Sequence, residues 1–216
     1  MPPTGCSLKY ERNLFKAGVQ RVAGIDEAGR GPLAGPVVAA AVILPLKFRH
    51  KRLDDSKKLT AQVREEIYVE LVSIVEIHWN VAVVDAIEVD RLNILRATHH
   101  AMRLAVAGLH ITPEHVLIDG LAVNPFPIPQ TPIVGGDAIS LSIAAASVIA
   151  KVTRDHIMRE MHTLYPEYDF DQHKGYSTPG HLAKLHKHGP CPIHRRSFEP
   201  VAQRVFNFQI EGQPAS

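Results

Sequence analysis

The sequence has no long uninterrupted apolar run. The longest stretch, Val37 to Leu46, contains a proline and is far shorter than the roughly 20 residues that a helix needs to cross a bilayer. It indicates a buried strand. The first residues, Met1 to Arg12, include several charged side chains and lack the apolar core of a secretion signal. These absences predict a cytoplasmic protein with no membrane association.

Cysteine and net charge are also scarce. The two cysteines, Cys6 and Cys191, lie at opposite ends of the chain, so the sequence offers no disulfide framework and fits a reducing compartment. Cys191 and His194 have the spacing of half a zinc site, but no second pair of ligands accompanies them, which argues against a zinc finger. The formal net charge is only +2, which is small for a domain that binds nucleic acid through charge alone.

The positive charge is unevenly distributed. The basic segment, which runs from His173 to Arg196, holds five Lys or Arg residues and five His residues but no acid. It predicts either a positive surface for nucleic acid or a solvated, irregular face, and charge alone does not separate the two.

The 216 residues, 45% of them hydrophobic, suffice for one substantial core. We expect a single domain over residues 20–210, with a C-terminal substrate-binding extension from about residue 162. Residues 1–19 form an N-terminal extension and residues 211–216 a tail. The sequence has no internal repeat and no low-complexity block.

Apolar patterning predicts strands over Arg21–Asp26, Val37–Leu44 and Ile74–Val84, arranged as a meander. An amphipathic helix should begin after Thr60 as N-cap and run to Val72, since Val63, Ile67 and Leu71 recur at fourfold spacing.

The second half of the chain has a different pattern. It predicts a helix over Arg91–Ala107 that ends in a left-handed cap at Gly108, then a strand over His115–Asp119. An irregular loop leads to a strand near Ile133, and an Ala-rich helix opened by Asp137 should run from Ala138 to about Met161. Together these elements predict an α/β fold with a mixed sheet and helices on its faces.

Four acids stand at the ends of these predicted elements. Asp26 and Glu27 end the first strand, Asp119 ends a later one, and Asp137 follows two glycines at a helix start. In such sheets the carboxyl ends of strands are where ligands bind. Taken singly, Asp137 is more often a helix cap, and Asp119 followed by Gly120 is more often a turn.

Convergence of all four acids would require compensation. Carboxylates about 4 Å apart at an effective dielectric constant near 20 repel by roughly 4 kcal/mol per pair. Six such pairs would rival the roughly 5–15 kcal/mol that holds a whole domain folded. The cluster would have to protonate, spread apart or hold cations, and hard oxygen ligands favour Mg²⁺ or Mn²⁺. Two such ions would suit hydrolysis of a phosphodiester.

Two details test this grouping. Asp155 lies on the same predicted helix as Asp137 but about 27 Å further along its axis, so it cannot share the ions and is interpreted as structural, paired with a neighbouring base. Asp26 and Glu27 are adjacent, and consecutive strand side chains point to opposite faces. The strand should therefore end or twist there, as Ala28 and Gly29 permit.

The run from Gly24 to Pro36, GIDEAGRGPLAGP, closely resembles the signature of the ribonuclease HII family. Further motifs resemble that family in the same order: Asp54–Thr60, Leu117–Gly120, Gly135–Ala138, Ser142–Asp155, His173–Tyr176 and His194–Phe198. The resemblance spans about residues 22–201. It implies a ribonuclease H-like fold, with a mixed five-stranded sheet flanked by helices and a helical or irregular C-terminal extension. It also implies that the metal-binding catalytic acids are Asp26, Glu27, Asp119 and Asp137.

The resemblance implies substrate-binding residues as well. Gly29, Arg30 and Gly31 would meet the ribonucleotide 2′-hydroxyl, which only RNA carries. Tyr176 would pack against the sugar on the DNA side of an RNA–DNA junction, although it could instead be a core or loop tyrosine. Other substrate contacts, chiefly to phosphate, are implied for Lys57, Lys58, Ser147, Lys151 and Arg195. The basic residues among them could equally be surface charges.

The implied activity is that of a two-metal endonuclease. It would cut the RNA strand of RNA/DNA hybrids and cut at ribonucleotides embedded in duplex DNA, leaving 5′-phosphate and 3′-hydroxyl ends. Its cellular roles would be removal of misincorporated ribonucleotides and of primer RNA. Two alternatives stay open: a metal-free module that binds DNA/RNA hybrids, and a metal-dependent phosphatase for small molecules.

The two ends of the chain bear on the choice within the family and on docking to a clamp. Only about 20 residues precede the first strand, so the long N-terminal domain of the sister group ribonuclease HIII is missing, which favours ribonuclease HII. We expect a monomer. Residues 209–216 contain no definable motif for a replication clamp, so docking to a clamp has no support in the sequence.

Overall fold

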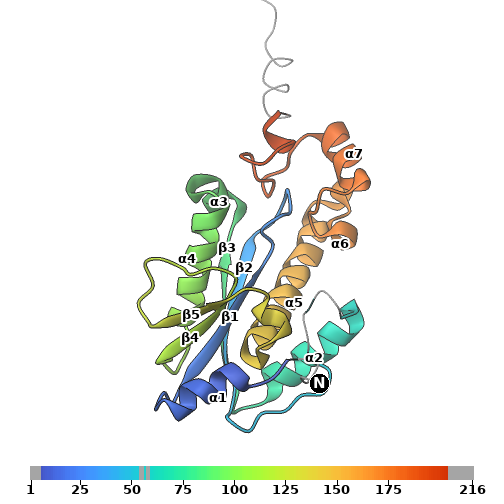
Figure 1. The fold of residues 1–216 in the computed structure, drawn as a ribbon. Coiled ribbons are helices and arrows are strands. Elements are labelled where there is room, and N and C mark those ends of the chain that lie inside the picture. The colour runs from blue at the N-terminus through green and yellow to red at the C-terminus, as the bar shows by residue number, and fades with distance from the viewer. Residues whose placement is uncertain (1–5, 54–55, 57–58, 204–216) are drawn as a thin grey trace, which may run out of the picture.

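The computed structural model describes residues 6–53, 56 and 59–203. A mixed five-stranded sheet with strand order β3-β2-β1-β4-β5 lies between helices, which confirms the predicted fold (Figure 1). Its strands are β1 Val22–Ala28, β2 Val37–Ile43, β3 His78–Val84, β4 His115–Asp119 and β5 Gln130–Ile133. The α-helices are α1 Lys9–Lys16, α2 Ala61–Ser73, α3 Ala86–Leu92, α4 Ile94–Ala107, α5 Leu141–Leu164, α6 Phe170–His173 and α7 Pro179–His188. Two short 3₁₀ turns are η1 Gly136–Ala138 and η2 Pro166–Tyr168.

Strand pairing brings the predicted acids to one edge of the sheet. β1, β2 and β3 form the predicted antiparallel meander, whereas β4 pairs parallel to β1, with Ile25 opposite Ile118. The residues that follow, Asp26 and Asp119, therefore lie beside each other where two parallel strands end. This is the position at which ligands bind in α/β sheets.

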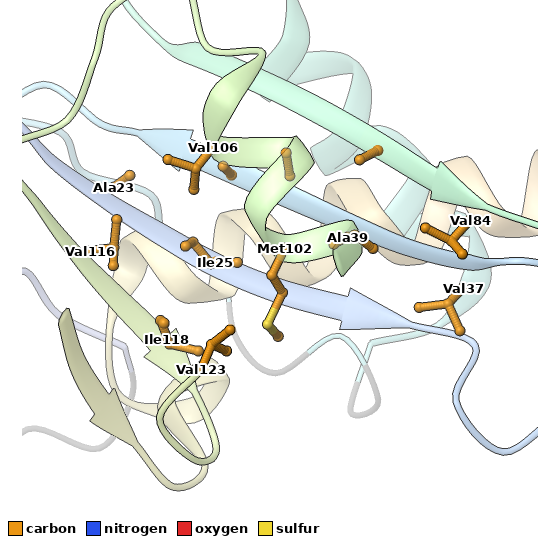
Figure 2. Close-up of a cluster of buried hydrophobic side chains, with 14 of the residues drawn as sticks. Ala23, Ile25, Val37, Ala39, Val84, Met102, Val106, Val116, Ile118 and Val123 are labelled. Atoms are coloured by element: carbon orange, nitrogen blue, oxygen red, sulfur yellow. The ribbon is translucent and has the colours of Figure 1, made fainter. Parts of the chain in front are cut away.

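Each face of the sheet carries its own core. On one face α4 packs Met102 and Val106 against Ile25 and its neighbours in β1, β2 and β4 (Figure 2). On the other face α5 packs against β1 and β2, and α2 adds Ile67 and Leu71. The ribbon in Figure 1 shows α4 and α5 on opposite sides of the sheet.

The helix predicted over Arg91–Ala107 is wrong as a single element. The chain breaks at Asn93, which has a φ of 66° and whose side chain accepts a hydrogen bond from Arg96 N to cap α4. Asparagine caps helices well, and the positive φ of Asn93 turns the chain out of one helix before its side chain caps the next. Gly108 has a φ of −85°, so the predicted left-handed cap is also wrong.

The start of α5 differs from the prediction as well. The helix begins at Leu141, and its N-cap is Ser140, whose Oγ accepts a hydrogen bond from Ile143 N. Asp137 belongs instead to η1, so it does not open the helix. In contrast, Thr60 caps α2 as predicted.

The N-terminal end of the described chain packs on the sheet, whereas the C-terminal end packs on α5. The apolar residues of α1, among them Leu14 and Phe15, contact Leu117 and Ile143. After α5 the chain forms η2, α6 and α7, whose core includes Phe170.

The predicted domain boundaries themselves stay a prediction. Across the described residues, none of the helices is both long enough and apolar enough to pass through a membrane.

Candidate active site

Three of the four predicted acids meet at the end of the parallel strands. Asp26 comes from β1, Asp119 from the last position of β4 and Asp137 from η1, and one carboxylate oxygen of each lies within 4.8 Å of the others. Asp26 and Asp137 are buried and Asp119 is half-buried. Gly136 N donates to Asp119 Oδ1 at 2.7 Å, which ties η1 to β4.

The electrostatics of this group favour a bound cation. Burial raises the pKa of Asp26 well above its usual value, and the negative charges of Glu27 and Asp119 raise it further. Hydrogen bonds from Ser147 and from Glu27 N act in the opposite direction. Because the grouped donors are all carboxylate oxygens, they fit a hard divalent cation such as Mg²⁺ or Mn²⁺.

Glu27 lies on the other face of β1. The strand does not end at Asp26, since β1 continues to Ala28. Asp26 pairs with Ala40, which faces α5, whereas Glu27 pairs with Ala39, which faces α4. Glu27 Oε1 accepts a hydrogen bond from Arg30 Nη1 at 3.3 Å.

A cavity of about 250 Å³ joins three of the predicted acids, Asp26, Glu27 and Asp119, to most of the predicted substrate-binding residues. We call it the site cavity. Its lining comprises Asp26, Glu27, Ala28, Gly29, Arg30, Gly31, Ser56, Asp119, Ser147, Lys151 and Tyr176. Glu27 therefore shares this space with Asp26 and Asp119, although it is not part of the close group of three.

The two glycines of the Gly29-Arg30-Gly31 turn differ in what they accommodate. Gly29 has a φ of +94°, and a Cβ there would lie 2.1 Å from Arg154 Nε, so the backbone itself requires glycine. A Cβ at Gly31 would meet no atom within 4 Å. Packing within the protein therefore does not explain why position 31 is a glycine. A ligand that approaches this backbone closely would explain it.

Arg195 does not make the phosphate contact that the resemblance implied. Its side chain is fully buried, and its guanidinium donates to the carbonyl oxygens of Gly35, Arg30 and Gly29 at 3.0, 2.9 and 2.6 Å. Burial, and next the charge of Arg154, lower the pKa of Arg195 to about 9. Its role is to hold the backbone of the turn.

Arg154 has a similar role that the sequence did not reveal. It is fully buried, and its guanidinium donates to the carbonyl oxygens of Pro36, Ala34 and Lys174 at 2.9 to 3.0 Å. A buried arginine and a surface arginine look alike in a single sequence. The one signal in the sequence was that Arg154 directly precedes Asp155, which was interpreted as structural.

Three further predicted contacts, Ser147, Lys151 and Tyr176, line the site cavity. Ser147 Oγ lies 2.8 Å from Ser56 Oγ, which links α5 to the segment before α2. Lys151 forms an ion pair with Asp155 at 2.6 Å, as predicted for that acid, and lies 5.9 Å from the centroid of the Tyr176 ring. Tyr176 is 42% exposed, so it is no core tyrosine. The predicted contacts Lys57 and Lys58 lie outside the described residues.

The basic segment is less positive than its composition suggested. Burial lowers the pKa of His181 to about 4 and that of His194 to about 3, so both are neutral at pH 7. Their Nε2 atoms lie 3.0 Å apart, and the Cys191 Sγ lies 3.1 Å from His194 Nδ1. These residues pack with aromatic rings inside the C-terminal extension, and the described residues show no zinc-like group there.

Comparisons with known proteins agree with this geometry. The family model described as Ribonuclease HII matches residues 23–201. The Ribonuclease HII of Geobacillus kaustophilus (strain HTA426) is 53% identical over 196 residues, which cover 91% of this chain and 75% of that protein.

Solved structures give the same result. The ribonuclease H2 from Pyrococcus horikoshii OT3 matches with a TM-score of 0.69 and 28% identity, covering 88% of this chain and 99% of that one. A chain of the PCNA:RNase HII complex from Archaeoglobus fulgidus matches with a TM-score of 0.66 and 26% identity, covering 83% of this chain and 96% of that one. The family model matches most of this chain, and the Geobacillus protein is 53% identical over 91% of it. The chain therefore belongs to the ribonuclease HII family.

Proposed function

We propose that this protein is a metal-dependent endonuclease that hydrolyses the RNA strand of RNA/DNA hybrids and cuts at ribonucleotides embedded in duplex DNA. Family membership supports ribonuclease H activity on RNA paired with DNA. The observation that carries the finer proposal is the site cavity, which places grouped carboxylates next to a glycine turn and a half-exposed tyrosine.

Asp26, Asp119 and Asp137 would hold the divalent ions, and Glu27 would add a carboxylate from the cavity wall. Two bound Mg²⁺ or Mn²⁺ ions would supply an activated water and stabilise the charge on the leaving 3′-oxygen. The products would carry 5′-phosphate and 3′-hydroxyl ends. Ser147, which donates to Asp26, would keep that carboxylate oriented in the cavity.

Recognition of the ribonucleotide would come from the turn and the tyrosine. The open space at Gly31 lets a ribose come close to the backbone, while Arg195 and Arg154 keep that backbone in place. The exposed ring of Tyr176 would pack against the next sugar, where a 2′-oxygen would clash. Lys151, beside that ring, suits a phosphate contact.

Cleavage of a DNA duplex that holds one ribonucleotide tests the proposal. We expect cleavage with Mg²⁺ or Mn²⁺, none with excess chelator, and a loss of about a hundred- to a thousandfold in Asp26→Asn and Asp119→Asn, as for removal of one main charge-stabilising group. Normal cleavage by either variant would contradict the assignment. Chelator-resistant function would instead favour the metal-free binding module.

A substrate comparison separates the third alternative. A phosphatase for small molecules would hydrolyse a simple phosphate ester without any need for the turn or Tyr176. We expect no such hydrolysis and cleavage only at ribonucleotides paired with DNA. The cellular roles that follow are ribonucleotide removal from DNA and degradation of primer RNA. The PCNA complex concerns the archaeal protein, and residues 204–216 of this chain lie outside the described part.

A further inference from the structure

Helix α1 lies outside the residues that the family model matches, yet one of its acidic side chains is buried in the interior. Glu11 is 1% exposed, and it is the buried residue of that helix. Figure 1 shows α1 beside the first turns of α5. A carboxylate is rarely buried this fully unless specific partners hold it.

The partners of Glu11 all belong to the start of α5. Its Oε1 accepts hydrogen bonds from Ser140 Oγ at 2.6 Å, Ser142 Oγ at 2.7 Å and Ser142 N at 3.1 Å. Ser140 is the N-cap of α5, and Ser142 lies in its first turn. A negative charge at a helix N-terminus is favoured by the unsatisfied N–H groups and the helix dipole.

Stability alone is a weak explanation for this arrangement. Glu11 Oε2 is buried and has no hydrogen-bond partner among the described residues. A buried, partly unsatisfied carboxylate costs free energy that an apolar side chain at the same place would not. The acid is therefore better explained by what it holds in place.

The segment before α1 forms hydrogen bonds with the residues around the turn η1, which carries Asp137. Ser7 N donates to Ile139 O at 2.9 Å, and Leu141 N donates to Ser7 O at 3.2 Å. Cys6 Sγ donates to the main-chain oxygen of Asp137 at 3.1 Å. Five of the residues from 137 to 142 are thus hydrogen-bonded to Cys6, Ser7 or Glu11.

The other side of the same backbone rests on β1. A Cβ on Gly24 would lie 2.2 Å from the carbonyl carbon of Ser142, so helix and strand are in direct backbone contact there. Gly24 lies two residues before Asp26, on the same face of the strand. Ser142 is therefore held between Glu11 and the strand that carries Asp26.

We infer that Glu11 is a positioning residue of the metal centre. By fixing Ser140 and Ser142 it sets the distance between Asp137 and Asp26, and this inference rests on the proposed role of Asp137 as a metal ligand. Mutation of a group that is hydrogen-bonded to a metal ligand typically changes metal affinity by 10- to 100-fold, and Glu11 acts one step further out, through Ser140 and Ser142.

A titration of the full chain with Mn²⁺ tests this inference without any activity measurement. Electron paramagnetic resonance of the free ion measures how much Mn²⁺ is bound. We expect Glu11→Ala to weaken Mn²⁺ binding by about tenfold, the low end of that range. Glu11→Gln keeps an oxygen that can accept from both serines, so it should retain most of the affinity. Ser142→Ala should lie between the two.

Leu14→Ala is the matched control, because it loosens the packing of α1 without removing a hydrogen bond to α5. It should lower the unfolding temperature and leave Mn²⁺ affinity unchanged. If Leu14→Ala weakened binding as much as Glu11→Ala, or if Glu11→Ala bound like the parent, the inference would be overturned. Should Glu11→Ala fail to fold, parent-like affinity in Ser142→Ala overturns it.

A kinetic measurement adds a second readout. In Glu11→Ala, raising the Mg²⁺ concentration should restore much of kcat, while KM for the nucleic acid stays near that of the parent. Asp137→Asn separates this inference from the proposed function. If Asp137→Asn bound Mn²⁺ like the parent, Asp137 would not be a metal ligand and the proposed function would lose that ligand. If Asp137→Asn lost Mn²⁺ binding but Glu11→Ala bound Mn²⁺ like the parent, only the inference about Glu11 would be refuted.

Discussion

At the residue scale, the carboxylate of Asp26 has a raised pKa, first because it is buried and then because Glu27 and Asp119 lie near it. A carboxyl group of this kind lowers folding stability as the pH rises from its unfolded pKa towards its higher folded pKa. Ionisation of this carboxylate in the metal-free protein therefore costs folding stability. A divalent cation would remove this penalty.

This charge gives a prediction about stability. In chelator at pH 7.5, we expect Asp26→Asn to be more stable than the parent by on the order of 1 kcal/mol, a rise in Tm of roughly 2–4 °C. Added Mn²⁺ should raise the Tm of the parent and have much less effect on the variant. Scanning calorimetry measures both, and Glu160→Gln, an exposed change on α5, should match the parent. Equal metal responses in parent and Asp26→Asn would contradict the proposed site.

Tyr176 provides a second prediction at this scale. Its ring is 42% exposed at the site cavity, and it would pack against the sugar on the DNA side, where a 2′-oxygen would clash. We expect Tyr176→Ala to reduce the preference for a single embedded ribonucleotide over an all-RNA hybrid by about tenfold or more. Tyr176→Phe should keep the preference, because the ring makes the contact. The ratio of kcat/KM on the two substrates measures it, and an unchanged ratio in Tyr176→Ala would refute the proposed role.

Single residues were predictable from the sequence where a motif fixed both residue type and position. The acids were found in this way, because they stand at the ends of predicted strands and beside glycines. Arg195 was assigned the wrong contact, because the sequence shows its charge and not the three carbonyl oxygens that surround it. Glu11 carried no signal, since one acid in a short helix is usually exposed.

At the scale of elements, the C-terminal extension depends on buried, neutral histidines. The ring of His173 stacks on that of His181 at 4.3 Å, and His181 Nδ1 lies 2.9 Å from the main-chain oxygen of Tyr176. His181 thereby links α7 to the residue that faces the site cavity. Protonation of this ring would place a charge in an apolar interior, which is costly.

The resulting pH dependence has a definite sign. Above pH 6.5 His181 is neutral in both the folded and the unfolded states, so it has no effect on stability. As the pH falls towards 4, the unfolded chain takes up a proton that the folded chain refuses, because burial lowers the folded pKa to about 4. The free energy of unfolding should then fall by about 3 kcal/mol on account of His181, at about 1.4 kcal/mol per pKa unit.

Urea unfolding between pH 7.5 and pH 4.5 measures this loss. We expect His181→Gln to flatten the decline, whereas His186→Gln, an exposed change on the same helix, should leave it as in the parent. A decline equally steep in His181→Gln would show that other groups cause it. The quantity compared is the slope with pH, so a uniform loss of stability in the variant does not affect the result.

Element boundaries were only partly predictable. Thr60 was found because a capping residue precedes a strongly periodic run. The break at Asn93 was missed because the apolar spacing continues across it, and a single residue with positive φ interrupts the helix without changing that spacing. The start of α5 was placed too early, since the small residues around Asp137 are compatible with a helix, and only the tertiary contacts make them a 3₁₀ turn.

At the scale of the whole molecule, the order of the strands determines the site. β4 pairs parallel to β1 in the middle of the sheet, so acids about 90 residues apart in the sequence end side by side. Alternating strands and helices predicted this sheet, and the ordered motifs predicted the family. The role of residues 6–11 could not be predicted, because it depends on contacts with residues about 130 positions later.

The most direct test of the metal site is anomalous diffraction from crystals of the protein soaked in Mn²⁺. We predict strong peaks at about 2.2 Å from carboxylate oxygens of Asp26, Asp119 and Asp137, since Mn²⁺ shares the oxygen preference of Mg²⁺. The same peaks should be missing from crystals of Asp26→Asn. Crystals of active parent protein with the three carboxylates apart and no peak among them would contradict the proposed catalytic centre.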